Sequence, residues 1–364
     1  MPIPAITLEV LPAAYGDCLL IQCPVGKRTW RMLVDTGPDD TFPTLKARLT
    51  ALPVDAKGQR RIDIFVVTHI DHDHIGGAGL LLNDKSLNLN IGDIWFNAPP
   101  RHLERGVAEG ESLAELLGAA RSPRPWNVAF SGKAAVTAGN GGFLELRAAR
   151  GAPRITLLSP SPDRLTDLFK VWDLELARLR RKEAEKPSAP DALTRGAAAL
   201  DIPALARGIT PTDQSVPNGS AIALLLEHQG ASILLGADAF PTTLRPALTG
   251  LAQHRKLAGP LSVDVFKLSH HGSRANLTTD LLSAVRASHY VVSTNNAIFN
   301  HPNDEAIARV LVHGGTQPRL WFNYGTQRNR RWADSDLQRE FGFSAVYPES
   351  ETGGVTIKLP RKVA

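Results

Sequence analysis

The feature that most limits the fold of this 364-residue chain is a group of metal-binding side chains in one short loop. Three histidines and two aspartates follow an apolar strand predicted over residues 62–68, within Thr68-His69-Ile70-Asp71-His72-Asp73-His74-Ile75-Gly76-Gly77. The strand fixes the first donor, the loop lets alternate side chains converge, and the glycines let the next helix start at close range. Without a cation, groups this close would compete or repel one another. The loop therefore predicts a metal centre at the end of a strand.

Strand-like and helix-like segments alternate in two groups on either side of a looser middle. Residues 1–98 begin as a β-meander, and residues 218–364 begin with a hairpin before strands and helices alternate. Between them, residues 99–217 contain clusters of Pro and Gly, one strand at 155–158 and one amphipathic helix at 162–186. Excess length between regular elements predicts an insertion or lid region that contributes at least one core strand.

The insertion has two interpretations. Its helix and the loop 178–190 could lie over the metal site as an autoinhibitory lid, or the segment could be a decoration or a dimer-forming element. The sequence does not decide between them, and it leaves the oligomeric state unknown.

Composition places the chain among soluble globular proteins, with 43% hydrophobic and 21% charged residues. The net charge of +5 permits a polyanionic partner but is too small to require one. Cys18 and Cys23 stand on one predicted strand with side chains facing opposite ways, so no disulfide is expected. With neither a signal-peptide pattern nor an apolar run of membrane-span length, we expect a cytoplasmic protein without a membrane partner.

Motifs along most of the chain resemble those of one family. They are Tyr15-Gly16-Asp17-Cys18, Val34-Asp35-Thr36-Gly37, Asn218-Gly219-Ser220, Gly236-Ala237-Asp238, His270-His271-Gly272-Ser273 and Asn300-His301-Pro302. Together with the loop described above, they resemble the metallo-β-lactamase superfamily, and most of all the nuclease-like domain of the ComEC family of DNA-uptake proteins. In that family the second histidine of the His-x-His-x-Asp-His signature is an aspartate, as Asp71 is here. The family's Gly-Asp pair has one residue inserted in this chain, and residues 99–217 fall outside the match.

The resemblance implies an α/β fold, the αββα sandwich of that superfamily, with a partly helical insertion between its two halves. It also implies two divalent metal ions, zinc or manganese, at one edge of the sandwich. Carried over position by position, the metal ligands are His69, Asp71, Asp73, His74, Asp238 and His270. In this arrangement Asp238 bridges the two ions, and the first ion is also held by His69 and Asp71. The second ion takes the remaining three ligands.

Four side chains are assigned to the substrate, namely Asn218, His271, Ser273 and His301, and one choice stays open. Strand alternation cannot tell which of His270 and His271 is the ligand, so we assign His270 to the metal and His271, with Ser273, to the substrate. Asn218 stands where the first metal lacks a third histidine, and would bind it weakly or contact the substrate.

Catalytic roles are assigned to Asp73 and His301. A histidine near the metals could give a proton to the leaving oxygen, and it would also contact the substrate. The other interpretation of His301 is a loop histidine that caps the following helix. We expect His72 to point away from the metals, and Asp35 is either a carboxylate that orients a ligand or a plain turn residue.

Two adjacent cations would lower the pKa of a bridging water and clamp the attacking and leaving oxygens of a displacement at phosphorus. Asp71 in place of an imidazole makes the first site harder, which favours manganese beside zinc. The sequence therefore predicts a metal-dependent hydrolase of phosphodiester bonds, most of all a DNA nuclease that uses a metal-bridging hydroxide. Its partner is DNA or another phosphodiester substrate.

Two alternatives stay open, because superfamily resemblance does not fix a substrate. One is a small-molecule phosphodiester or ester hydrolase of the same fold. The other is a latent signalling module that needs activation, for which a regulatory protein partner is expected. Arg328, Arg330 and Arg331, close to several aromatic residues, could follow a nucleic-acid backbone or form a solvated face.

Overall fold

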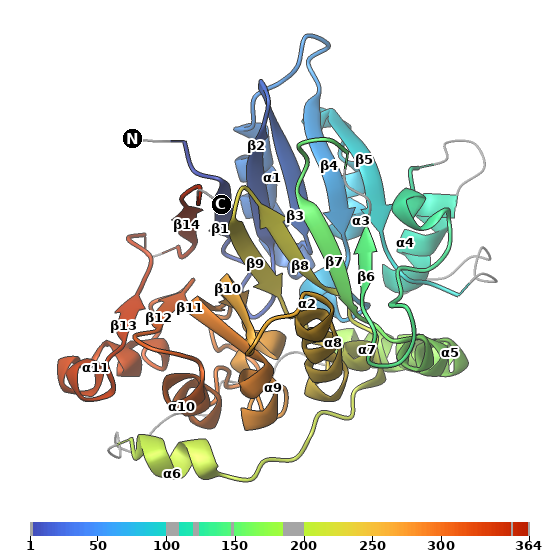
Figure 1. The fold of residues 1–364 in the computed structure, drawn as a ribbon. Coiled ribbons are helices and arrows are strands. Elements are labelled where there is room, and N and C mark those ends of the chain that lie inside the picture. Colours follow the sequence, from blue (N-terminus) through green and yellow to red (C-terminus); the bar gives the residue numbers. More distant parts are fainter. Residues whose placement is uncertain are drawn as a thin grey trace.

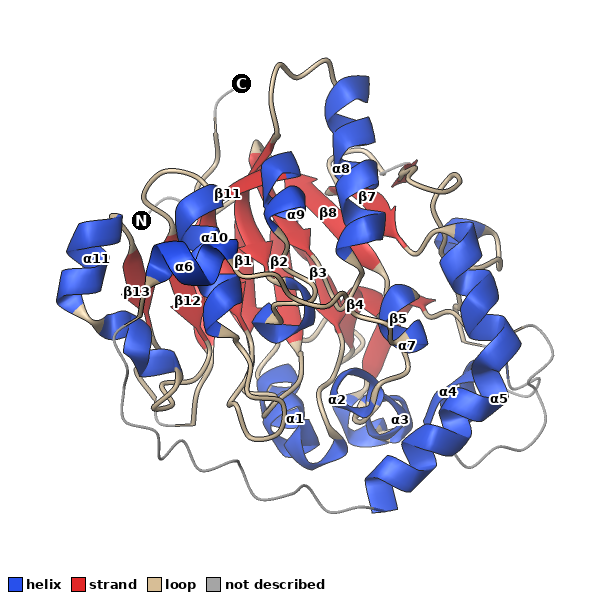
Figure 2. Ribbon diagram, turned by 90° about the horizontal axis from the view of Figure 1, so that it is seen from below, coloured by secondary structure: helices blue, strands red, loops and turns tan. Residues whose placement is uncertain are grey.

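Two β-sheets lie face to face, with helices on both outer sides (Figures 1 and 2). The computed structural model describes residues 3–99, 109–118, 124–146, 149–184, 200–350 and 352–362. Within these ranges the layers run helix, sheet, sheet, helix, which confirms the predicted αββα sandwich.

The smaller sheet has the strand order β14-β1-β2-β3-β4-β5. Its strands are β1 (Ile6–Val10), β2 (Leu19–Val25), β3 (Arg28–Val34), β4 (Arg60–Val66), β5 (Leu89–Trp95) and β14 (Val355–Leu359). The larger sheet has the order β13-β12-β11-β10-β9-β8-β7-β6. Its strands are β6 (Leu144–Leu146), β7 (Arg154–Ser159), β8 (Ala223–His228), β9 (Ala231–Leu235), β10 (Leu261–Lys267), β11 (Val285–Val292), β12 (Arg319–Phe322) and β13 (Ser344–Val346).

Helices cover the outer face of each sheet. Those in the first half and the insertion are α1 (Phe42–Thr50), α2 (His72–Ile75), α3 (Ala78–Asn83), α4 (Glu109–Gly118), α5 (Pro162–Ala184), α6 (Ile202–Arg207) and α7 (Val216–Gly219). Those in the second half are α8 (Pro241–His254), α9 (Thr279–Ala284), α10 (Asp304–His313) and α11 (Ser335–Phe341). Across the described ranges, no helix combines the length and the apolar character that a membrane crossing requires.

The direction of the strands decides where functional side chains can meet. Strands β3, β4 and β5 run parallel, and so do β9, β10 and β11. Parallel strands bring their carboxyl ends to one edge of a sheet, where α/β proteins bind their ligands. The segments after β3, β4, β9, β10 and β11 therefore converge, and they carry almost every candidate residue named above.

The core has three layers of apolar side chains. One lies between the sheets and includes Cys23 and Met32, while two others lie between each sheet and its helices. Cys18 belongs to the outer layer beside the smaller sheet, so the two cysteines face opposite sides as predicted, and both are free and buried. The alternating burial of β1 and β14 follows from the same geometry, because successive side chains point to opposite faces.

The described part of residues 99–217 is built into the sandwich. Strand β7 is buried and pairs with β8 on one side and β6 on the other. Leu165, Leu168 and Trp172 of α5 pack into the outer core beside the smaller sheet. The end of the predicted loop 178–190, from residue 185 on, lies outside the described residues. The domain boundaries and the lid remain predictions.

The apolar face of α5 provides a test of how firmly the insertion is attached. Leu168 is 1% exposed, whereas Leu174 on the same helix is 63% exposed. We expect Leu168→Ala to lower the free energy of unfolding by about 2–5 kcal/mol because it leaves a cavity, and Leu174→Ala by less than about 0.5 kcal/mol. Urea unfolding followed by circular dichroism measures both. Equally small losses would show that α5 is only loosely docked.

Candidate metal centre

One buried carboxylate orients two histidines of the loop after β4. Nδ1 of His74 donates a 2.8 Å hydrogen bond to Oδ2 of Asp35, and the Thr68 hydroxyl donates to the same oxygen at 2.8 Å. Nδ1 of His69 lies 2.9 Å from that hydroxyl, which accepts because its own proton is used on Asp35. Both imidazoles therefore present an unprotonated Nε2 atom, which is the form that binds a metal.

Two more histidines come from the turn after β10. Nδ1 of His271 donates to the carbonyl of Ser293 at 2.8 Å. Nδ1 of His270 lies 3.0 Å from Oδ1 of Asn276 and 3.2 Å from Oδ2 of Asp213. Each Nδ1 faces acceptors and so carries the proton, which again leaves Nε2 with its lone pair.

The turn that presents these two histidines has a strained backbone. His270, His271 and Gly272 take left-handed φ values of 48°, 53° and 85°. This conformation is unfavourable for residues with a Cβ atom, and such residues gather at functional sites. The His270 N–H donates to the carbonyl of Ala237 at 2.8 Å, which ties the turn to the segment after β9. Because the two histidines follow the strand in a turn, strand alternation could not predict their directions.

Asp238, only 2% exposed, lies between two groups of side chains. Its Oδ2 is 3.6 Å from Nε2 of His270 and 3.9 Å from Nε2 of His69. Asp71 joins the same side, with Oδ2 at 3.7 Å from Nε2 of His69. Asp71 is the N-cap of α2 but makes no side-chain capping bond, so its carboxylate is available to the centre.

The other oxygen of Asp238 faces the second group. Oδ1 of Asp238 is 3.4 Å from Nε2 of His74. Oδ2 of Asp73 is 3.7 Å from Nε2 of His74 and 3.1 Å from Nε2 of His271. The structure thus places His271, rather than His270, beside Asp73 and His74, and both histidines meet the centre. Our assignment of His270 to that group and of His271 to the substrate is revised accordingly.

These residues fit a metal ion. Nε2 of His69, Nε2 of His74 and Oδ1 of Asp238 are buried and have no hydrogen-bond partner among the described residues. Donors 2.0–2.2 Å from one tetrahedral cation lie roughly 3.3–3.6 Å from each other, close to the separations found here. Nε2 of His271 lies 3.1 Å from Oδ2 of Asp73, a contact that either a proton on the imidazole or a bound cation can satisfy.

The pKa values show the same conflict of charges. Burial, with the neighbouring carboxylates Asp73 and Asp238, raises the pKa of Asp71 to about 7. Burial and the nearby His74 lower the pKa of His69 to about 3. Burial opposes the charged form of His74 as well, but Asp238, Asp73 and Asp35 raise its pKa well above its usual value. Divalent cations would hold the carboxylates ionised and the imidazoles neutral.

The turn after β9 accommodates Ala237, the residue inserted before Asp238. Ala237 takes a left-handed φ of 44°. A Cβ atom at Gly236 would lie 2.4 Å from Oγ of Ser269, so glycine is needed where β9 passes the turn after β10. Asp238 therefore reaches the centre although the family spacing is changed.

Asn218 and Ser273, expected at the substrate, support the histidine turn instead. Nδ2 of Asn218 donates to Asp213 at 2.7 Å and lies 3.4 Å from Nδ1 of His270. Oγ of Ser273 accepts the Ala275 N–H at 3.3 Å. The two side chains are 3% and 4% exposed, so direct contact with a substrate stays a prediction without support from these bonds.

His301 lies beside the centre, with its ring centroid 5.1 Å from that of His270. It is 9% exposed, and its Nδ1 has no hydrogen-bond partner within the described ranges. Burial, then the charges of His270 and His271, lower the pKa of His301 well below its usual value. A neutral imidazole donates a hydrogen bond but is a poor source of a proton. Proton transfer from His301 stays a prediction, and hydrogen bonding suits its surroundings better.

Sequence reasoning missed Asp213 and Lys267. Lys267, 1% exposed, pairs with Asp17, whose Oδ1 lies 3.4 Å from Nδ1 of His271. Asp17 stands in one of the motifs quoted above, so the motif could have drawn attention to it. Asp213 comes from the irregular end of the insertion, where no pattern marks it.

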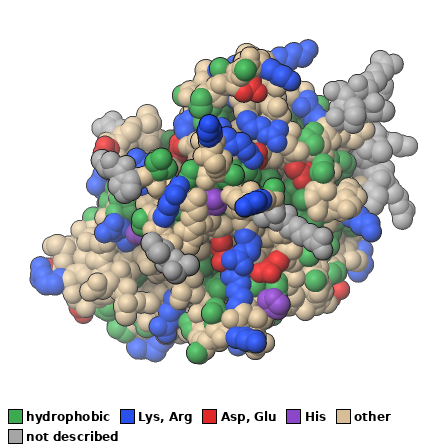
Figure 3. Space-filling view, turned by 45° about the horizontal axis from the view of Figure 1, so that its top comes forward, with side chains coloured by type: hydrophobic (Ala, Val, Ile, Leu, Met, Phe, Trp, Pro, Cys, Tyr) green, Lys and Arg blue, Asp and Glu red, His purple; other side chains and the backbone are tan. Residues whose placement is uncertain are grey.

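Other predicted features lie outside the centre. Nε2 of His72 lies 3.4 Å from Oδ1 of Asp39. In the basic cluster, Arg331 pairs with Asp304 at 2.6 Å, and Trp332 is 1% exposed. Arg331 and Trp332 therefore make contacts within the fold. On the face of the molecule drawn in Figure 3, Lys and Arg side chains are mixed with other side chains.

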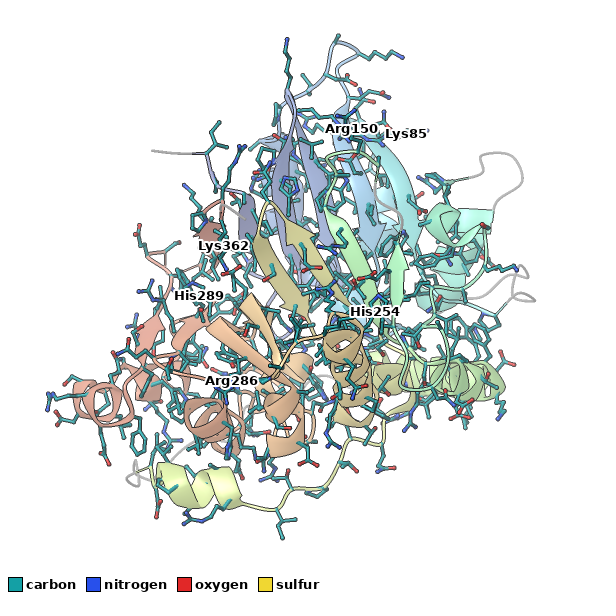
Figure 4. The ribbon with its side chains drawn as sticks, viewed as in Figure 1. Lys85, Arg150, His254, Arg286, His289 and Lys362 are labelled. Carbon is teal, nitrogen blue, oxygen red and sulfur yellow. The ribbon has the colours of Figure 1, made fainter. Side chains whose placement is uncertain are left out.

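Two histidines labelled in Figure 4 stand apart from the centre. His254, at the end of α8, packs beside Phe143 with ring centroids 5.5 Å apart. His289 of β11 accepts a 3.1 Å hydrogen bond from Nε1 of Trp321. They are natural controls for substitutions at the centre.

Residues 12–146 match the family model of the metallo-β-lactamase superfamily, a range that contains the ligand loop. This part of the chain is therefore similar to the metallo-β-lactamase superfamily. The chain is also 20% identical to ComE operon protein 3 of Bacillus subtilis (strain 168), in an alignment that covers 96% of this chain and 35% of that protein. The chain thus spans about a third of the length of this curated relative. Both matches confirm the resemblance drawn from the motifs.

Two solved structures align over most of the chain. The metallo-β-lactamase fold protein YhfI from Bacillus subtilis has a TM-score of 0.44 and 12% identity, covering 97% of this chain and 99% of its own. A mutant of CmlA β-hydroxylase has a TM-score of 0.39 and 15% identity, covering 99% of this chain and 55% of its own. These alignments are too loose to carry any property over.

Asp35 provides a test of the metal centre that leaves every ligand in place. We expect Asp35→Asn to weaken manganese or zinc binding about 10- to 100-fold, because the amide is neutral and its NH2 group would replace one of the two oxygens that accept from Thr68 and His74. Competition with a fluorescent chelator measures the affinity, and near-ultraviolet circular dichroism checks the fold.

The matched control for this variant is Asp93→Asn. Asp93 is a 7% exposed carboxylate of β5 that accepts the N–H groups of Val128 and Ala129. We expect the metal affinity of Asp93→Asn to stay within about twofold of that of the parent. Equal losses in the two variants would contradict the role assigned to Asp35.

Proposed function

We propose that this chain is a metal-dependent phosphodiesterase that acts on DNA. The observation that carries the proposal is the position of Asp238, whose Oδ1 faces Nε2 of His74 and whose Oδ2 faces Nε2 of His69 and of His270. A carboxylate in this position suits two cations side by side, which is the arrangement used for in-line displacement at phosphorus.

In this proposal two sets of ligands share Asp238. One set is His69, Asp71 and His270, and the other is Asp73, His74 and His271. His270 thereby takes the place of the third histidine that the sequence lacks for the first metal. Manganese and zinc both suit this mixture of imidazole and carboxylate.

When bound, two divalent cations would supply Lewis-acid polarisation of a phosphoryl oxygen and lower the pKa of water. The carboxylates Asp71, Asp73 and Asp238 do not fully balance two divalent charges, so the loaded centre attracts an anionic substrate. The chain's own residues set the geometry: Asp35 and Ser293 fix the ring orientations, and His301 donates a hydrogen bond to a substrate oxygen from the edge of the centre.

DNA is the preferred substrate in this proposal because the ligand loop and the histidine turn resemble motifs of a DNA-uptake family, and the chain aligns over 96% of its length with ComE operon protein 3. A smaller phosphodiester or an ester would use the same centre. A latent form that needs a regulatory protein would bind metal without cleavage until activated.

The direct test is cleavage of linear and circular plasmid DNA with manganese, zinc, magnesium or a chelator. We expect cleavage that needs metal, and a loss of at least about 100-fold in Asp73→Ala, because that variant removes a ligand. His254→Ala is the matched control, since that histidine lies outside the centre, and it should keep the parental rate.

Cleavage that survives chelation, or that Asp73→Ala leaves intact, would contradict the proposal. Metal-loaded protein that spares DNA but hydrolyses a small phosphodiester would keep the reaction and change the substrate. Metal-loaded protein inactive on both would favour the latent form.

A further inference from the structure

The edge of the centre carries an exposed aromatic pair that the proposed chemistry does not use. Phe299, in the loop after β11, is 43% exposed, although Phe is a residue type usually found inside. The ring of Tyr15 meets it edge-on, with centroids 5.9 Å apart and an angle of 74° between the planes. Tyr15 belongs to the loop between β1 and β2, so the two halves of the chain together build this pair, which we call the aromatic rim.

His301 connects the aromatic rim to the centre. Its ring stacks on Phe299 at 6.1 Å with an angle of 25°, and it meets the ring of His270 at 5.1 Å. His270 in turn faces Asp238 through Nε2. Phe299 is therefore two ring contacts away from the centre, on the same side as His270 and His301.

We propose that Phe299 stacks a nucleobase of the substrate beside the scissile phosphate, with Tyr15 holding the Phe299 ring in place. This inference rests on the proposed function and narrows its substrate to nucleotides with an unstacked base, as in single-stranded DNA or frayed ends. Stacking on an exposed aromatic ring stabilises binding and tolerates any base. The aromatic rim thus selects single strands without reading sequence.

A quaternary ammonium group is the other ligand that an exposed aromatic ring attracts. Such cations are held by cages in which several ring faces converge. At the aromatic rim, His301 covers one face of Phe299 and Tyr15 meets that ring edge-on. Only the other face of the Phe299 ring is left for a ligand, and one flat face suits a flat base better than a cation.

The test compares two phosphodiesters that share p-nitrophenolate as the leaving group. One is the p-nitrophenyl ester of thymidine 5′-phosphate, and the other is its abasic analogue, with hydrogen in place of thymine. For the metal-loaded full chain, we expect kcat/KM to be about 5- to 150-fold higher for the nucleotide ester. Phe299→Ala should bring this ratio to about 1, and Phe299→Trp should keep or raise it.

Leu257→Ala is the matched control. Leu257 is 44% exposed in the loop before β10, at the other end of that strand from the histidine turn. In Leu257→Ala, the ratio of kcat/KM for the nucleotide ester to that for the abasic ester should equal the ratio in the parent. If Phe299→Ala slows both esters equally, the ring only supports His301 and the proposal is overturned. Faster hydrolysis of p-nitrophenyl phosphocholine than of the nucleotide ester, lost in Phe299→Ala, would overturn it in favour of a cation site.

A binding measurement separates this inference from the proposed function. Calorimetric titration of the metal-loaded protein with thymidine 5′-monophosphate and with deoxyribose 5-phosphate needs no turnover. Tighter binding of the nucleotide that Phe299→Ala abolishes supports the stacking surface even where neither ester is cleaved. Equal affinities of the parent protein for both ligands overturn it, whatever the catalytic result.

Discussion

The buried carboxylate of Asp238 and the imidazoles around it make the most demanding set of contacts in the fold. In their neutral forms, His69 and His74 carry their proton on Nδ1, which leaves Nε2 without a proton opposite Asp238. Buried polar groups without partners each cost up to a few kcal/mol, and buried charges cost more. A cation on each side of Asp238, as proposed above, would remove this cost. Metal binding would thus compensate for an arrangement that is otherwise unfavourable for folding.

The sandwich explains how such a centre is built from distant parts of the chain. Parallel strands place Asp35, His69, Asp238 and His270 just after their carboxyl ends, at one edge, while the residues within the strands pack in the core. Close contacts between backbone segments also bring the loops together. A Cβ atom at Gly16 would lie 1.9 Å from the carbonyl oxygen of Asp73, so glycine lets the first loop lie directly against the ligand loop.

Much of this could be predicted from the sequence. An apolar run predicts the strand at residues 155–158, observed as β7 (Arg154–Ser159), and the helix predicted from residue 162 begins there as α5. The short edge strands β6 and β13 were missed because three residues hold too little pattern. The first residues of β11 alternate between buried and exposed, which gives a weaker apolar signal than its fully buried end.

At the centre, the ligand loop was predictable because its donors are adjacent in sequence. The histidine pair was not, since consecutive left-handed residues turn His270 and His271 in directions that no strand pattern describes. Asp213 and Ser293 were missed for a similar reason. Their roles come from the positions of a carboxylate and a carbonyl in space, and neither position is marked by local sequence.

The measurement that tests the central claim most directly is an anomalous X-ray diffraction map from crystals of the protein grown with manganese. The account predicts two strong peaks, one on each side of the Asp238 carboxylate, with His69, Asp71 and His270 around one and Asp73, His74 and His271 around the other. A single peak, or peaks away from Asp238, would contradict it.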